Sequence, residues 1–158
     1  MDKLNIIKLI VAIIICEIIG SIGTIFTTPN ISTWYATLTK PFFSPPNFLF
    51  APVWTLLFAL MGIALYLIWL NKKDLLKRKI AIMFFIIQFA FNVLWSYLFF
   101  GLRNPFFGFV GILLLWIMII ATIITFYRVD KKAAYLLIPY ILWVSFAMIL
   151  NYSIMILN

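Results

Sequence analysis

Polar side chains are rare within the long apolar runs of this chain, and three of them share one stretch. Gln88, Asn92 and Ser96 lie in the sequence IIQFAFNVLWSYLFF. At 100° per residue, Gln88, Asn92 and Trp95 fall within about 60° of one another on a helix. Amides in such a position can orient the polar edge of a ligand, or they can hydrogen-bond a neighbouring helix. The spacing is compatible with both roles.

Two other apolar runs carry aromatic side chains at the same helical spacing. One stripe consists of Trp54, Phe58, Met61 and Leu65, and the other of Tyr140, Trp143, Ala147 and Asn151. Broad aromatic surface with few amides and little charge is typical of a pocket for a large, flat, mostly apolar ligand. We therefore expect the three stripes to face one ligand-binding pocket.

Glu17 is the only acidic residue inside an apolar run. A carboxylate in the middle of a bilayer costs roughly 2.5–3.5 kcal/mol even on the more lenient scale, so Glu17 calls for an explanation. We expect Glu17 to be protonated, or hydrogen-bonded near Gly20-Ser21 and Gly23-Thr24, as a neutral acid. The alternative is a proton-coupled site, as in a small drug antiporter.

The chain offers little to a conventional enzyme. It has no histidine and one cysteine, Cys16, so the commonest general base and an internal disulfide are both excluded. We find no Cys cluster, Gly-rich phosphate loop or nucleophile elbow, and we expect no metal site and no obligatory cofactor. A hydrolytic or redox enzyme with a protein-borne nucleophile is not supported.

The elements that must position these residues are membrane-spanning helices. The chain is 66% hydrophobic with a mean hydropathy of +1.18, and its apolar runs are continuous rather than alternating. About 20 apolar residues cross the hydrocarbon layer, and within it the backbone must be satisfied inside each segment. The sequence therefore predicts a single all-α domain over 1–158, with five spans at about 6–26, 49–70, 80–100, 106–127 and 134–156.

Basic residues sit in every second connection between these spans. Ten of the twelve would share one side, and only Lys40 and Arg103 the other. Because basic loops stay cytoplasmic, we expect the N-terminus inside and the C-terminus outside. The net charge of +8 is explained by these flanking residues, so nucleic-acid binding is not expected.

The connection at about 27–48 differs from the other connections. It contains Pro29, Pro41, Pro45 and Pro46 and five aromatic residues. The prolines rule out one continuous helix, and the aromatic content argues against disorder. The segment is either an aromatic belt at the membrane interface or a lid that caps a ligand cavity.

Three stretches resemble the TspO/MBR family, that of the tryptophan-rich sensory proteins and mitochondrial translocator proteins. They are WYATLTKPFFSPPNFLFAPVWTLLFALMGIALYLIW (Trp34–Trp69), QFAFNVLWSYLFFGLRNP (Gln88–Pro105) and LLIPYILWVSFAMILNY (Leu136–Tyr152). The pattern W-Y-x-x-L-x-K-P-x-x-x-P-P with P-V-W downstream is highly specific. The resemblance covers essentially the whole chain in the same order.

The resemblance implies a five-helix bundle, often a homodimer, with a ligand cavity under the first loop. It implies that the ligand is protoporphyrin IX, a sterol, or a benzodiazepine- or isoquinoline-type drug. The pocket residues that it carries over are Tyr35, Pro46, Trp54, Asn92, Trp95, Trp143 and Ala147. The stripes above add Phe58, Gln88, Tyr140 and Asn151. The family's sterol motif needs a basic residue after its tyrosine, and Tyr152 is followed by SIMILN, which argues against sterols.

These expectations lead to alternative functions. The first is a porphyrin-binding protein or porphyrin sensor of a prokaryotic cytoplasmic membrane. Its bound pigment could be degraded in light through the indoles of Trp54 and Trp143. The second is a transporter of porphyrins, sterols or small apolar drugs, although the sequence shows no inverted repeat.

Overall fold

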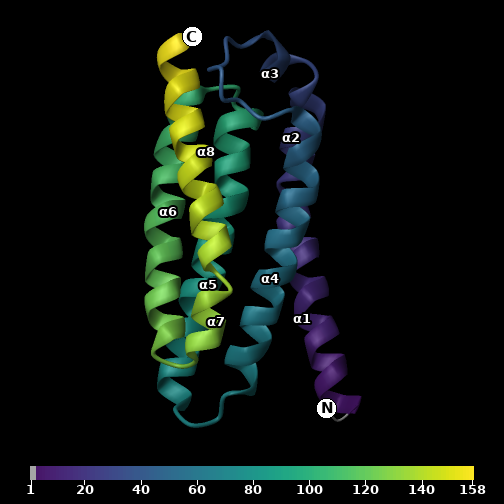
Figure 1. The fold of residues 1–158 in the computed structure, drawn as a ribbon, viewed down its shortest axis with the longest axis vertical. Helices are drawn as coiled ribbons and strands as arrows, with labels where there is room; N and C mark the ends of the chain where they lie inside the picture. Colours follow the sequence, from purple (N-terminus) through teal and green to yellow (C-terminus); the bar gives the residue numbers. More distant parts are fainter. Residues whose placement is uncertain (1–2) are drawn as a thin grey trace.

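Five helical columns run along the long axis of the molecule (Figure 1), as a computed structural model of residues 3–158 shows. The columns are α1 (Lys3–Ile22) with α2 (Thr24–Ile31), α4 (Phe50–Leu70), α5 (Leu75–Ser96) with η2 (Tyr97–Gly101), α6 (Pro105–Tyr127), and α7 (Lys131–Tyr135) with α8 (Ile138–Leu157). Each column contains a stretch long and apolar enough to cross a membrane. The predicted five-helix membrane bundle is confirmed.

Capping residues set the starts of three helices. The side chain of Asp74 accepts a hydrogen bond from the Lys77 backbone N–H at 3.0 Å, and this bond lowers the pKa of the Asp74 carboxyl. The third span therefore begins at Leu75 rather than at residue 80, because a capped helix tolerates charged residues in its first turn. Asn104 and Asp130 cap α6 and α7 in the same way.

The first column extends further than the sequence suggested. After a break at Gly23, helix α2 continues to Ile31, with Pro29 inside it. The Asn30 side chain donates to the Phe26 carbonyl at 2.8 Å, and Thr27 donates to that of Gly23 at 3.1 Å. The expected start of the connection at residue 27 is wrong, because the helix persists through the proline.

The segment between α2 and α4 is folded over one end of the bundle (Figure 1). It contains the short helix α3 (Trp34–Thr37) and the turn η1 (Asn47–Leu49). Tyr35 is buried, and the ammonium group of Lys40 lies 4.5 Å from the centre of its ring. The side chain of Asn158 exchanges two hydrogen bonds with the backbone of Thr39, at 2.9 and 3.0 Å. The C-terminal residue thus ties this segment to α8.

Small residues allow close packing within the chain. A Cβ atom at Gly62 would lie 2.5 Å from the Ile13 Cα atom, so α1 and α4 approach almost backbone to backbone. A Cβ atom at Gly108 would meet Phe99 and Asn151, and one at Gly111 would meet Leu98. These glycines therefore serve contacts inside one chain, and the homodimer stays a prediction.

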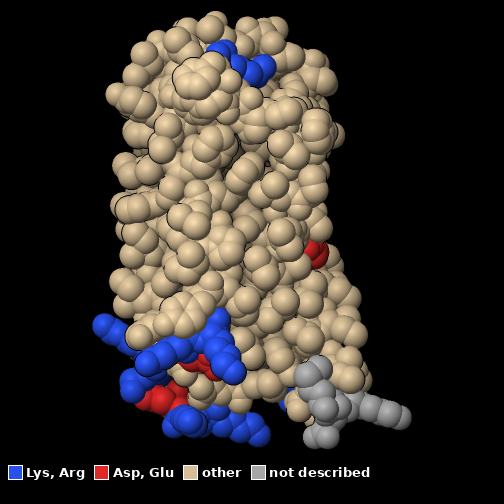
Figure 2. All heavy atoms as spheres, in the orientation of Figure 1, with Lys and Arg blue, Asp and Glu red and all other residues tan. Residues whose placement is uncertain are grey.

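Charged side chains gather at one end of the bundle, where the α4–α5 and α6–α7 connections lie, and two basic residues lie at the other end (Figure 2). Between the two ends the visible surface is almost free of charge (Figure 2). This distribution matches a membrane protein with a bilayer around its middle. The sidedness of the bundle stays a prediction.

Cysteine labelling in intact cells tests this sidedness. In a Cys16→Ala background, we expect a membrane-impermeant maleimide to label Lys40→Cys but not Lys72→Cys, because the basic end faces the cytoplasm. Permeabilised cells, in which both cysteines should react, are the control. Labelling of Lys72→Cys alone in intact cells would contradict the predicted orientation.

Candidate functional site

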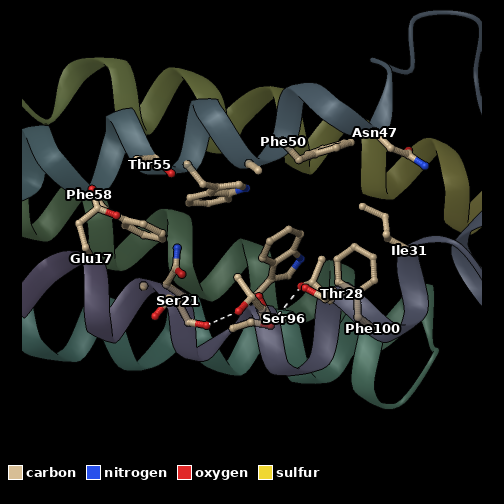
Figure 3. Close-up of a pocket in the computed structure, with 18 of the residues that line it drawn as sticks. Glu17, Ser21, Thr28, Ile31, Asn47, Phe50, Thr55, Phe58, Ser96 and Phe100 are labelled. Atoms are coloured by element: carbon tan, nitrogen blue, oxygen red, sulfur yellow. Dashed lines mark hydrogen bonds between the residues drawn. The ribbon is translucent and has the colours of Figure 1, made fainter.

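A cavity of about 460 Å³ lies between the α1–α2 column, α4 and α5. Figure 3 shows side chains of the α1–α2 column facing those of α4 across this hollow. Its depth is formed by buried residues of α4 and α5, and its rim by exposed residues of α2 and α4, namely Thr24, Thr28, Ala51 and Thr55. The cavity therefore opens sideways, on the surface that would face lipid.

Aromatic rings form one wall. The rings of Trp54 and Phe58 stack with their centroids 5.4 Å apart and their planes at 27°. The ring centroids of Trp95 and Trp54 lie 6.1 Å apart, with their planes at 35°. Phe100 completes the wall toward the end of the bundle that the segment between α2 and α4 covers. Nearly parallel rings next to an open space can accept another flat ring system by stacking.

The opposite wall carries polar side chains from the first column. Glu17, Ser21, Thr24 and Thr28 follow one another at spacings of four, three and four residues, which places them on one helix face. Ser21 donates to the Ile18 carbonyl at 2.8 Å, and Thr24 donates to the Ser21 carbonyl. Neither hydroxyl therefore donates to Glu17.

Glu17 makes no hydrogen bond or ion pair with any residue in 3–158. The expectation of a carboxyl bonded near Gly20-Ser21 or Gly23-Thr24 is therefore wrong. The reason is local, because hydroxyls in a helix satisfy themselves on carbonyls three or four residues back. The carboxyl lies instead beside Phe58 in the cavity (Figure 3).

The structure separates the expected pocket residues into two groups. Trp54, Phe58, Asn92 and Trp95 line this cavity together. Seven others do not line it, namely Tyr35, Pro46, Gln88, Tyr140, Trp143, Ala147 and Asn151. For these seven residues a role in ligand binding stays a prediction.

Hydrogen bonds explain the position of several residues in the second group. The Tyr140 hydroxyl donates to Gln88 Oε1 at 2.9 Å and accepts from Asn92 Nδ2 at 3.1 Å. Trp95 Nε1 donates to Asn151 Oδ1 at 3.3 Å. These buried bonds join α5 to α8, so the amides act as links between helices, and Asn92 also reaches the cavity.

Phe50 stands between the cavity and Trp143. It lines the cavity, and its ring lies 6.2 Å from that of Trp143 and 6.5 Å from that of Tyr35. Behind it, Trp143 packs on Phe146, and its buried indole N–H has no partner among the described residues. Burial also raises the pKa of the Tyr35 hydroxyl above its ordinary value.

The residues that sequence reasoning missed are the hydroxyls of the polar wall and the rim. The three-and-four spacing that selected the aromatic stripes also continues from Glu17 through Ser21 and Thr24 to Thr28. Ser21 and Thr24 were considered only as hydrogen-bond partners of Glu17, and Thr28 lies beyond residue 26, where the helix was expected to end. Thr55 on α4 directly follows Trp54, and the search for aromatic stripes selected Trp54 alone.

The cavity holds no evident machinery for bond-making chemistry. Within residues 3–158, no group of three or more His, Cys, Asp or Glu side chains is placed to hold a metal ion. Cys16 is buried next to Glu17 in sequence, but it is not among the residues that line the cavity. The arrangement can bind, stack and hydrogen-bond a ligand.

Comparison with known proteins shows which family this chain belongs to. The family model described as TspO/MBR matches residues 12–157. The chain belongs to the TspO/MBR family. The resemblance carried by the tryptophan- and proline-rich motifs is thereby confirmed.

Relatives of this family member match most of its length. The tryptophan-rich protein TspO of Archaeoglobus fulgidus is 47% identical over 98% of this chain and 99% of its own. The translocator protein of Ovis aries is 38% identical over 84% of this chain and 79% of its own. The tryptophan-rich sensory protein of Cereibacter sphaeroides is 34% identical over 79% of this chain and 77% of its own.

The Tyr140 hydroxyl should matter for the stability of this TspO/MBR chain. Tyr140→Phe leaves Gln88 Oε1 and Asn92 Nδ2 buried without their partner, which costs about 1–3 kcal/mol of unfolding free energy. We expect a lower thermal midpoint in detergent. Tyr152→Phe is the control, since Tyr152 is exposed and its hydroxyl bonds no residue in 3–158. Equal midpoints for both variants would show that the network contributes little.

Proposed function

We propose that the protein binds a flat, largely apolar molecule of the tetrapyrrole class, such as protoporphyrin IX, in the cavity between α1–α2, α4 and α5. The observation that carries this proposal is the pair of indoles, Trp54 and Trp95, on one wall of a cavity of about 460 Å³. Ligand pockets of about 300–1,000 Å³ with mostly apolar walls and a few polar groups are typical of small-molecule sites. Benzodiazepine- or isoquinoline-type drugs would occupy the same space.

The relatives support a role that is less specific than tetrapyrrole binding. Their names include tryptophan-rich sensory protein and translocator protein, which agree with a sensory or translocator role in a membrane. Bacterial and archaeal relatives also agree with a multi-pass protein of a prokaryotic cytoplasmic membrane. Binding a membrane-soluble ligand is common to sensing and translocation.

A porphyrin in this cavity would gain most of its affinity from stacking on the indole rings. Its carboxylates would have to point toward the rim, where Asn47 and Thr28 supply polar groups. The cavity lining contains no Lys or Arg. With no histidine in the chain, a free-base porphyrin suits it better than an axially ligated haem.

Light-dependent breakdown of the pigment is the second part of this proposal. An excited porphyrin generates reactive oxygen, and an indole in contact with it can capture that species or pass on a radical. Trp54 lines the cavity, whereas Trp143 lies behind Phe50. We therefore assign the photo-oxidative role to Trp54 ahead of Trp143.

Translocation is the other candidate, and one observation favours it. The carboxyl of Glu17 lies in a cavity that opens on the lipid-facing surface, as a proton-coupled carrier would require. Flux of protoporphyrin IX into proteoliposomes that is lost in Glu17→Gln would support transport. Tight binding without flux would support the binding and sensing role.

Substitution of one cavity indole tests the proposed function. We expect Trp54→Leu to weaken protoporphyrin IX binding about tenfold, or about 1.4 kcal/mol, because a stacking surface is lost. Porphyrin fluorescence in the dark measures the affinity, and its bleaching under light measures breakdown. The control is Trp69→Leu, since Trp69 is exposed on the same helix and lies outside the cavity. Unchanged affinity in Trp54→Leu would exclude this cavity as the porphyrin site.

A further inference from the structure

The charge on the cavity lining is of one sign. Glu17 is the only ionisable side chain that lines the cavity. Counted along the helices at 1.5 Å per residue, it lies about 21 Å from Lys3 and about 21 Å from Ile31, halfway along the first column. A bilayer around the molecule would place this carboxyl near its middle.

Arg103 and Lys40, the two basic residues at the lightly charged end of the bundle, contact side chains other than Glu17. The guanidinium Nε of Arg103 donates to Asn30 Oδ1 at 2.9 Å, and Lys40 lies over the Tyr35 ring. Neither residue lines the cavity. The elements that face Glu17 supply Phe58, Thr55 and Asn92, none of which is ionisable in the usual range. Nothing in the described protein therefore neutralises a Glu17 carboxylate.

The neighbours of Glu17 are the kind that bind organic cations. Phe58 lies beside the carboxyl (Figure 3), and its ring packs with those of Trp54 and Phe89, with centroids 5.4 and 5.9 Å away. The faces of aromatic rings carry negative charge density and attract ammonium groups, most strongly where water is excluded. A carboxylate next to such faces adds a full negative charge and a hydrogen-bond acceptor.

We propose that Glu17, with Phe58 and Trp54, forms a cation subsite that selects flat aromatic molecules carrying a protonated amine over neutral or anionic molecules of the same shape. The cation would supply the counter-charge that the described residues do not place beside Glu17. The flat rings would stack on Trp54 and Trp95, and the ammonium group would point along the polar wall toward Glu17. The side opening gives such amphiphiles a route from the bilayer, where they dissolve. This inference rests on the part of the proposed function that makes the cavity a ligand site.

Three pyrene probes of matched shape test the subsite: 1-pyrenemethylamine, 1-pyrenemethanol and 1-pyrenecarboxylate. Binding is followed by energy transfer from the protein's tryptophans in phosphatidylcholine nanodiscs, with protein-free discs to subtract partitioning. We expect the amine to bind about tenfold more tightly than the alcohol, and the carboxylate to bind most weakly. In Glu17→Gln the advantage of the amine should fall to about twofold or less, while the alcohol is unaffected.

Asp74→Asn is the matched control, because it removes a carboxylate outside the cavity while asparagine can still cap α5. It should leave the amine-to-alcohol ratio unchanged. A merely structural role for Glu17 would weaken all three probes equally in Glu17→Gln and would overturn the subsite, as would an equal affinity for amine and alcohol in the natural protein. Protoporphyrin IX, titrated in parallel, separates the two proposals. Glu17-dependent amine binding without porphyrin binding would leave the subsite standing and remove only the porphyrin.

Discussion

In a bilayer, a polar side chain within a spanning helix needs a partner from the protein itself, because lipid offers none. Buried polar side chains of α5 and α8 meet that requirement by bonding one another. Gln88, Asn92 and Tyr140 bond one another in the core, and Trp95 bonds Asn151, so α5 and α8 are joined through their side chains. Among the described residues Glu17 finds no such partner, and it lies instead in a cavity.

The aromatic residues also fall into a group that packs in the core and a group that lines the cavity. The aromatic residues on the α8 side of Phe50 pack against one another and against the segment between α2 and α4. In one such contact, the ring centroids of Phe43 and Phe146 lie 6.3 Å apart. Those on the other side, Trp54 and Trp95, leave open space next to the first column. The bundle thus has a sealed half and an open half, and the ligand chemistry proposed here belongs to the open half.

The sequence predicted the class of fold well, because spans of about 20 apolar residues in lipid permit few solutions. It also placed Trp54, Phe58, Asn92 and Trp95 on faces that do meet at the cavity. Periodicity could not decide which stripes share a hollow, since that depends on side chains such as Phe50 that fill the space between them. The ligand-facing role of the polar wall was missed because Ser21 and Thr24 were considered only as partners of Glu17. Thr28 was missed because the helix was expected to end at residue 26, whereas it continues to Ile31.

The most direct test of this account is a structure of the protein with protoporphyrin IX bound in a lipid environment. We expect the macrocycle to lie between the α1–α2 column and the rings of Trp54 and Trp95, with its edge at the opening beside Thr28 and Thr55. A macrocycle found on the other side of Phe50, against Trp143 and Phe146, would contradict it.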